Sequence, residues 1–191
     1  GALGSADFWV SLYFGKLLNV DPKNPWMKER DRLILSAGHY CPVLYATLAE
    51  AEFFEIEKLD TLRKLGSHLQ GHTVARSLPG VENSSGPLGQ GISVAVGLAL
   101  GAKMNKEKHK VVCFMGDGEQ NEGQVWEAYM SASKFRLNNL LVVIDRNNIQ
   151  IDGFTETVMP LESLSAKLTA FGFYVIEIDG HNFEEIEDAY R

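Results

Sequence analysis

The stretch that decides the fold covers residues 111–145 and reads VVCFMGDGEQNEGQVWEAYMSASKFRLNNLLVVID. Residues 111–115 and 140–144 are continuous apolar runs, which are typical of strands buried on both faces. Between them, the apolar side chains of residues 122–135 recur at helical spacing. A strand, a helix and a second strand predict a right-handed unit of a parallel sheet.

The same alternation continues on both sides of this stretch. It predicts strands at residues 32–36 and 173–178 and helices at residues 40–54, 92–104 and 164–171. We therefore expect the α/β class, with a parallel sheet that is covered by helices on both faces. The chain begins with an amphipathic pattern and stops inside another, so we expect one domain over residues 1–191 that is incomplete at both ends.

Composition narrows the classes of function. The chain has 191 residues, 18 basic and 25 acidic side chains, a net charge of -7 and 45% hydrophobic residues. Without a Lys/Arg cluster, this charge argues against a nucleic acid as the main partner. Cys41 and Cys113 lie in apolar surroundings and form no CxxC pair, which favours a reducing compartment. The longest apolar run, residues 92–102, is too short to span a membrane, so we expect a cytoplasmic protein with no membrane partner.

Polar residues follow the two central strands, where ligands bind in parallel sheets. Gly116-Asp117-Gly118 allows a sharp turn, and the helix start after it offers free N–H groups to a phosphate. Taken alone, such a turn is common. Asn147 follows the neighbouring strand, however, and a carboxylate, an amide oxygen, a backbone carbonyl and ligand phosphate oxygens suit magnesium.

With these residues the chain resembles the transketolase family of thiamine diphosphate enzymes. The likeness is carried by Gly116-Asp117-Gly118 with Asn147-Asn148, and by Ser36-Ala37-Gly38-His39, Gly71-His72, Pro79-Gly80-Val81-Glu82 and Gly86-Pro87-Leu88-Gly89-Gln90-Gly91. The resemblance covers nearly the whole chain. It implies the amino-terminal, diphosphate-binding part of a transketolase, which transfers a two-carbon ketol unit from a ketose phosphate to an aldose phosphate in the pentose phosphate pathway.

The resemblance also implies roles for individual residues. Magnesium, or calcium or manganese in its place, would be held by the side chains of Asp117 and Asn147 and by the carbonyl of Ile149. Thiamine diphosphate would contact His39, Gly86, Leu88, Asp117, Gly118, Asn147 and Ile151. His39, His72 and Glu122 are the catalytic candidates, since histidines can hydrogen-bond sugar hydroxyls or move their protons.

Other interpretations of these residues stay open. His39 could be a helix-start histidine with no task. Glu122 could do no more than stabilise a helix amino terminus through its interaction with the helix dipole. The resemblance suggests instead that Glu122 and Glu127 are buried acids between subunits. His68, His109 and His181 match no family position.

Parts of the family pattern are absent from these residues. A Gly-His-x-Gly segment and a later histidine-bearing loop would lie outside the chain, and the carboxylate that activates the cofactor belongs to a pyrimidine-binding domain. We therefore expect a pyrimidine-binding carboxy-terminal chain or domain as partner, with a dimer of such pairs. The agreement of residues 14–22 with short forms of the family favours a split subunit.

Three alternatives remain. Deoxyxylulose-phosphate synthase and the alpha subunits of 2-oxo acid dehydrogenases share the Gly-Asp-Gly to Asn layout, but the loop at residues 86–91 argues against both. A non-catalytic, transketolase-like binding subunit is a third interpretation, against which the intact Asp117, Asn147, His39 and His72 speak. A plain nucleotide-binding sheet fails because no GxGxxG or Walker A pattern follows a strand.

Overall fold

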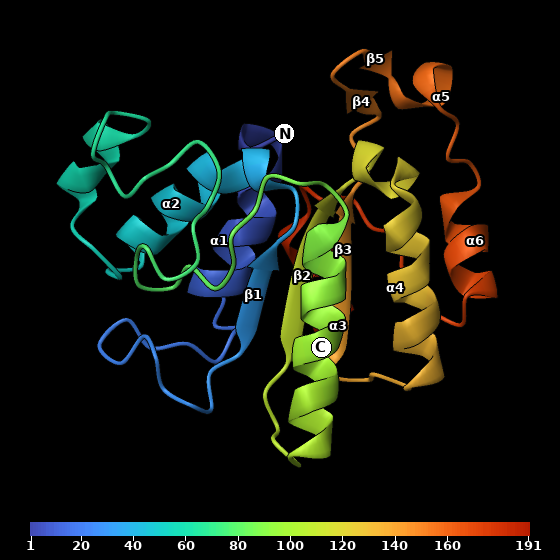
Figure 1. The fold of residues 1–191 in the computed structure, drawn as a ribbon, viewed down its shortest axis with the longest axis horizontal. Coiled ribbons are helices and arrows are strands. Elements are labelled where there is room, and N and C mark those ends of the chain that lie inside the picture. The colour runs from blue at the N-terminus through green and yellow to red at the C-terminus, as the bar shows by residue number, and fades with distance from the viewer.

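The computed structural model describes residues 1–191 and contains a three-stranded parallel sheet at its centre (Figure 1). The strands are β1 (Arg32–Leu35), β2 (Val111–Gly116) and β3 (Leu140–Asp145), in the spatial order β1-β2-β3. Arg32 pairs with Val111, and Gly116 pairs with Asp145 at the other end. All three strands therefore end at one edge of the sheet, as the apolar runs predict.

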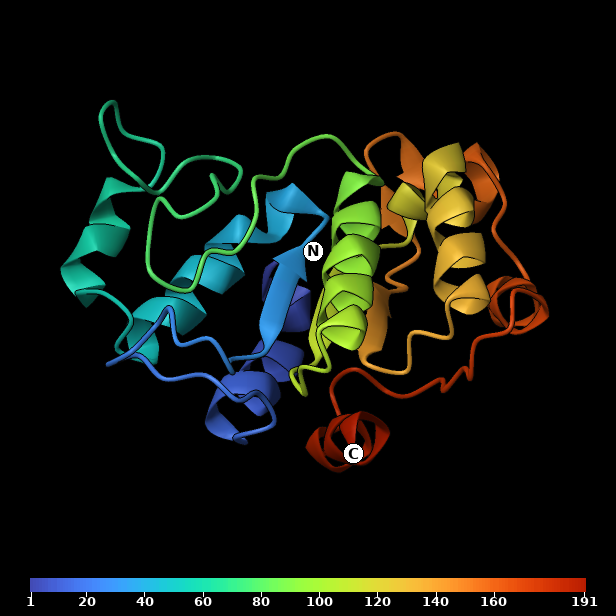
Figure 2. The ribbon, with the colours of Figure 1, turned by 60° about the horizontal axis from the view of Figure 1, so that its bottom comes forward.

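Helices cover both faces of this sheet. They are α1 (Ala6–Phe14), α2 (Cys41–Glu50), α3 (Gln90–Met104), α4 (Gly123–Lys134), α5 (Thr155–Val158), α6 (Leu164–Ala170) and α7 (Phe183–Tyr190). Short 3-10 helices occupy Leu3–Ser5, Gly38–Tyr40, Ile56–Thr61 and Gly118–Asn121. Figure 2 shows α3 and α7 on opposite sides of the sheet. The predicted α/β fold is thus confirmed.

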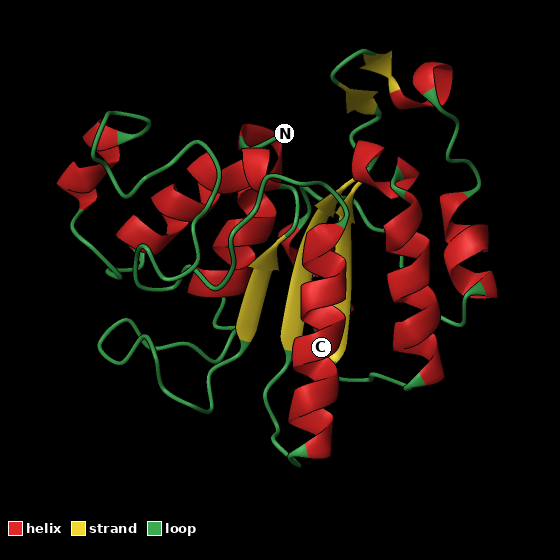
Figure 3. Cartoon of the chain, in the orientation of Figure 1, coloured by secondary structure: helices red, strands yellow, loops and turns green.

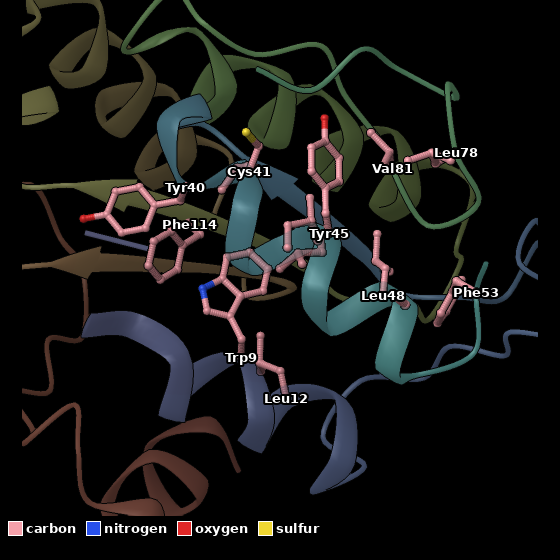
Figure 4. Close-up of a cluster of buried hydrophobic side chains, with 14 of the residues drawn as sticks. Trp9, Leu12, Tyr40, Cys41, Tyr45, Leu48, Phe53, Leu78, Val81 and Phe114 are labelled. Carbon is pink, nitrogen blue, oxygen red and sulfur yellow. The ribbon is translucent and has the colours of Figure 1, made fainter. Parts of the chain in front are cut away.

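Two clusters of buried side chains make up the core, one on each face. Along β2, Val112 and Phe114 point to one cluster, while Cys113 and Met115 point to the other. This is the alternation that a strand buried on both faces must show. Figure 4 shows the first cluster, in which the Trp9 ring lies 5.1 Å from the ring of Phe114. The second cluster joins the sheet to α3, α4 and α6.

Beyond the ends of β2 and β3, the chain forms a small projecting hairpin (Figure 3). Its strands are β4 (Ile149–Gln150) and β5 (Gly153–Phe154), which pair antiparallel, and α5 follows directly. The hairpin is too short to have a core of its own. It is held by its contacts with the loop that follows β2, which are described below.

Two predicted elements differ from the structure. Residues 173–178 form no strand, and the sheet ends at β3. Phe173 and Val175 pack on the second core cluster, while Tyr174 is 90% exposed. The alternating pattern therefore reports one buried side but no backbone pairing. Helix α2 ends at Glu50, earlier than predicted, because Glu52 adopts a left-handed φ of 64°.

Both cysteines are buried free thiols, in agreement with their apolar sequence surroundings. None of the helices combines the length and the apolar character that a membrane crossing requires.

Candidate active site

The loops after β2 and β3 meet at the carboxylate of Asp117. This side chain is 2% exposed. Its Oδ1 accepts a hydrogen bond from the Gly118 N–H at 2.7 Å. Its Oδ2 accepts from the Asn148 N–H at 2.8 Å, from Thr155 Oγ1 at 3.0 Å and from Arg146 Nη1 at 2.9 Å. Asp117 therefore ties the turn after β2 to the loop after β3, as the predicted adjacency of strand ends requires.

Asn147 is oriented by a second set of contacts. Its Nδ2 donates to Tyr40 Oη at 3.0 Å and to Asp145 Oδ2 at 3.1 Å, and its Oδ1 accepts from the Ile149 N–H at 3.0 Å. The Tyr40 hydroxyl donates to the same Asp145 oxygen at 2.6 Å. Burial and the Asp145 hydrogen bond raise the pKa of Tyr40, which keeps its hydroxyl a donor. The amide of Asn147 is thus fixed by donors and acceptors on both sides.

Arg146 is a functional candidate that the sequence analysis missed. Besides Asp117, its guanidinium contacts Glu156 Oε1 at 2.5 Å and Glu162 Oε1 at 2.9 Å. It therefore links the segment after β5 to the buried carboxylate. One feature of the sequence could have indicated Arg146: it lies between Asp145 and Asn147 and is the single cation in an otherwise uncharged or acidic loop.

The oxygen donors at this edge have the chemistry that a hard divalent cation prefers. Asp117 Oδ1 and Asn147 Oδ1 each accept a single hydrogen bond, which leaves a lone pair on each, and Ile149 adds a backbone carbonyl. The structure holds no group of three or more His, Cys, Asp or Glu side chains suited to a metal ion. A metal at this edge would therefore rely on amide and carbonyl oxygens and on oxygens of its ligand, and the residues present fit magnesium with a diphosphate.

The segments that carry the predicted histidines lie next to residues 86–89, here called the glycine loop, beside this edge of the sheet. A Cβ added at Gly38 would lie 2.8 Å from His72 Cδ2 and 2.8 Å from the Gly86 nitrogen. The segment that carries His39 therefore approaches both His72 and Gly86 so closely that only glycine is accommodated at position 38. Partial burial, the charge of the chain's amino terminus and the nearby His72 lower the pKa of His39, in that order. The His39 ring lies 4.7 Å from that of Tyr40.

Other predicted residues are less closely associated with the site. Ile151 is 99% exposed at the tip of the β4–β5 hairpin, and Ile149 is 60% exposed. The side chains of Glu122 and Glu127 are exposed and make no side-chain hydrogen bond. Within this chain, Glu122 is the residue before α4, and its side chain makes no capping hydrogen bond to that helix.

The remaining contacts around the glycine loop involve residues that the sequence analysis did not single out. The buried Glu119 accepts from the Gly89 N–H at 2.8 Å, and Gln124 Nε2 donates to the Leu88 carbonyl at 2.9 Å. The loop of residues 86–89 is therefore held by side chains that follow the Gly-Asp-Gly turn. No local sequence pattern predicts such contacts, because they join residues about 30 positions or more apart.

Comparison with known proteins places this arrangement in a family. The family model described as "Transketolase, thiamine diphosphate binding domain" matches residues 1–191. A 6-deoxy-6-sulfo-D-fructose transketolase subunit of Clostridium sp. strain MSTE9 is 47% identical over 99% of this chain, which covers 68% of that protein. An apulose-4-phosphate transketolase subunit of Phocaeicola vulgatus is 44% identical over the whole chain, which covers 67% of it.

A solved structure agrees with these relatives. Transketolase from Leishmania mexicana superimposes with a TM-score of 0.88 at 31% identity, over 97% of this chain and 32% of that one. The chain thus spans about two thirds of the subunit-type relatives and about a third of a full-length transketolase. It belongs to the transketolase family, in the part described as its thiamine diphosphate binding domain.

Proposed function

We propose that residues 1–191 form the diphosphate-binding domain of a split transketolase-type enzyme, which transfers a two-carbon ketol unit from a ketose phosphate to an aldose phosphate. The observation that carries this proposal is the convergence of the Asp117 and Asn147 loops at one sheet edge, beside His39, His72 and Gly86. Membership of the transketolase family supports it.

In this proposal, Asp117, Asn147 and the Ile149 carbonyl hold magnesium, and the Gly118 backbone contacts the diphosphate. A Cβ at Gly118 would lie 2.9 Å from Gln150 Cβ, so the turn leaves no room for a larger residue. The backbone of Gly86 and Leu88 faces the aminopyrimidine, and Ile151 packs against the thiazolium ring.

Thiamine diphosphate, when bound, supplies the group that stabilises the negative charge left when the ketol carbon–carbon bond breaks. The protein supplies orientation and proton movement. Because the pKa of His39 is lowered, its ring is neutral near pH 7 and can accept a proton from a sugar hydroxyl. His72, brought beside it across Gly38, hydrogen-bonds the same part of the sugar.

The proposed enzyme needs a partner, because the acid that activates the cofactor is expected on a pyrimidine-binding chain or domain. Large apolar side chains are exposed around the site edge, among them Ile149 (60%), Ile151 (99%), Phe154 (67%) and Met159 (57%). Such a cluster is typical of a surface that another chain or domain covers. We place the working enzyme in the cytoplasm as a dimer of such pairs.

The donor sugar has two candidates. The first is a ketose phosphate of the pentose phosphate pathway, as in the proposal above. The second is a sulfonated ketose, which is favoured by the 47% identity to a subunit named for 6-deoxy-6-sulfo-D-fructose. Turnover of the assembled enzyme with xylulose 5-phosphate and with 6-deoxy-6-sulfofructose, compared at equal concentration, distinguishes the two.

The cofactor site is tested by calorimetric titration of thiamine diphosphate, with magnesium or with EDTA, into the full-length chain and its pyrimidine-domain partner. Asp117→Ala should abolish the magnesium-dependent binding while circular dichroism shows a retained fold. Asp152→Ala, in the exposed hairpin turn, is the matched control and should bind like the unmodified chain. Unchanged affinity in Asp117→Ala would refute the site.

The role of His72 has a separate kinetic test. His72→Ala should lower turnover while the affinity for thiamine diphosphate stays nearly unchanged, since the imidazole serves the substrate and not the cofactor anchor. His68→Ala, on a loop histidine with no proposed role, is the control. Unchanged kinetics in His72→Ala would return this residue to an ordinary loop position.

A further inference from the structure

The carboxylate of Glu119 is buried and joins three segments that are distant in the sequence. It is 2% exposed. Its Oε1 accepts from Ser36 Oγ and from the Gly89 N–H at 2.8 Å, and its Oε2 accepts from the Gly116 N–H at 3.1 Å. Burial raises the pKa of this carboxyl, and the three donors oppose that effect, since none of the salt bridges of the structure includes Glu119.

The three donors lie where the site segments begin or end. Ser36 follows β1 and leads to Gly38 and His39, and Gly116 closes β2 directly before Asp117. Gly89 ends the glycine loop and precedes α3. One buried carboxylate thus sets the relative position of the segments that carry the histidine, the metal ligand and the glycine loop.

A second side chain holds the same peptide unit as Glu119. Gln124 Nε2 donates to the Leu88 carbonyl at 2.9 Å, while Glu119 accepts from the Gly89 N–H, so both polar atoms of the Leu88–Gly89 peptide are bound by side chains. Gly89 has a φ of 77°, and a Cβ on it would lie 2.9 Å from Glu122 Cβ. Side chains therefore hydrogen-bond both polar atoms of this peptide, at a position that only glycine can occupy without strain.

We propose that Glu119 and Gln124 are positioning residues, which fix the backbone of residues 86–88 relative to Asp117 and Gly118. The inference rests on the proposed function, in which one cofactor bridges these two segments. A bridging ligand binds tightly only when both of its contact surfaces are held at the correct separation. A ligand that contacts the loops after β2 and β3 but not residues 86–88 does not depend on that separation.

Two variants that keep the size of the side chain test this proposal. Glu119→Gln leaves a single acceptor oxygen, which can serve Gly89 or Gly116 but not both, so the variant loses either the direct bond to Gly89 or the local bond to Gly116 that orients the side chain. Gln124→Glu replaces the donor to the Leu88 carbonyl by an acceptor, and the two oxygens repel each other. Glu57→Gln, on an exposed side chain with no hydrogen bond, is the matched control.

The measurement compares two ligands on the full-length chain combined with its pyrimidine-domain partner. Thiamine diphosphate and inorganic pyrophosphate are each titrated calorimetrically with magnesium. Loss of one hydrogen bond to a charged or buried group predicts that thiamine diphosphate binds about tenfold more weakly in each variant. The affinity for pyrophosphate should stay within about twofold, since its proposed contacts lie on the loops after β2 and β3 and not on residues 86–88.

The outcomes separate this inference from the proposed function. If the unmodified enzyme binds thiamine diphosphate but both variants match Glu57→Gln, or lose affinity for both ligands equally, the positioning role is wrong. If the unmodified enzyme itself fails to bind thiamine diphosphate, the proposed function fails and the inference with it. Thermal unfolding without ligand confirms the fold of each variant, and the half-buried Gln124 provides the test if Glu119→Gln does not fold.

Discussion

Replacing Arg146 tests whether this cation organises the candidate site. Arg146→Met keeps most of the aliphatic stem but removes the guanidinium that contacts Asp117, Glu156 and Glu162. Three carboxylates then lie close together without the cation between them. We expect the domain to lose stability and the segment from α5 to residue 162 to loosen.

The size of this loss follows from the exposure of each partner. The side chains of Glu156 and Glu162 are 38% and 57% exposed, so their contacts with Arg146 contribute little. The side chain of Asp117 is 2% exposed, and its bond to Arg146 is 2.9 Å long. A hydrogen bond of this kind to a charged group contributes about 1.5–3 kcal/mol. Asp117 keeps three other donors, so the loss stays below the roughly 3–5 kcal/mol of a buried charge left without partners.

We therefore predict that Arg146→Met lowers the free energy of unfolding by about 2 kcal/mol at neutral pH. In urea denaturation followed by circular dichroism, with a slope of about 2 kcal/mol/M, the midpoint should fall by about 1 M. Arg191→Met is the matched control, because that side chain is 65% exposed and its guanidinium pairs only with Glu187 and Asp188 of the adjoining helix α7. A midpoint shift in Arg146→Met no larger than that of the control would refute the reasoning.

Two further predictions concern the histidine segment and its glycine. Because the folded-state pKa of His39 lies below the ordinary value of 6.5, the unfolded chain takes up this proton first as the pH falls. The contribution of neutral His39 to the free energy of unfolding is therefore fully present above pH about 6.5 and is lost as the pH falls through the pKa of the folded state. In urea denaturation at different pH values, His39→Gln should remove this pH dependence. An NMR titration midpoint of His39 at or above 6.5 would contradict this. Gly38→Ala should destabilise the domain by about 1–3 kcal/mol, because the added Cβ would collide with Ser85, Gly86 and His72. Gly97→Ala on α3 is the control, because no atom lies within 4 Å of the added Cβ. This change should be neutral or should stabilise the domain by up to about 1 kcal/mol. Equal effects at the two glycines would show that position 38 is not crowded.

The sheet and one half of the site could be predicted from local sequence patterns. Residues 111–116 form a strand that is buried along its whole length, and a parallel strand buried on both faces leaves a continuous apolar run in the sequence. Residues 140–145 carry the same kind of run and also form a strand, but β3 is an outer strand of the sheet and is only half-buried. The meeting of Asp117 with the Asn147 loop follows from the same pattern, since parallel strands end at a common edge. The Asn148 N–H bound to Asp117 Oδ2 is the direct expression of that geometry.

The other half of the site could not be predicted in this way. The approach of His72 and Gly86 to Gly38 is made by a long irregular loop, whose course no periodic pattern specifies. Family resemblance supplied His39, His72 and Gly86, while Glu119 and Arg146 remained unnoticed. Their contacts depend on the reach of single side chains across segments that only the folded chain brings together. The failure at residues 173–178 has a related cause, because alternation indicates a buried side and is silent about a pairing strand.

The electrostatics of the site also account for how an acidic chain can accommodate a diphosphate. The chain carries a net charge of -7, and residues 116–123 with residues 145–153 contain a single cation, Arg146. That cation is engaged by three carboxylates, and the buried Glu119 is satisfied by a hydroxyl and two backbone N–H groups. Asp117 and Glu119 are therefore held by donors within the protein, but no free lysine or arginine of these loops is left for a phosphate. Under the proposed function, positive charge for the ligand would come from backbone dipoles and from the proposed divalent cation. This charge requirement would explain why the proposed magnesium ligands and the proposed diphosphate contacts occur in the same two loops.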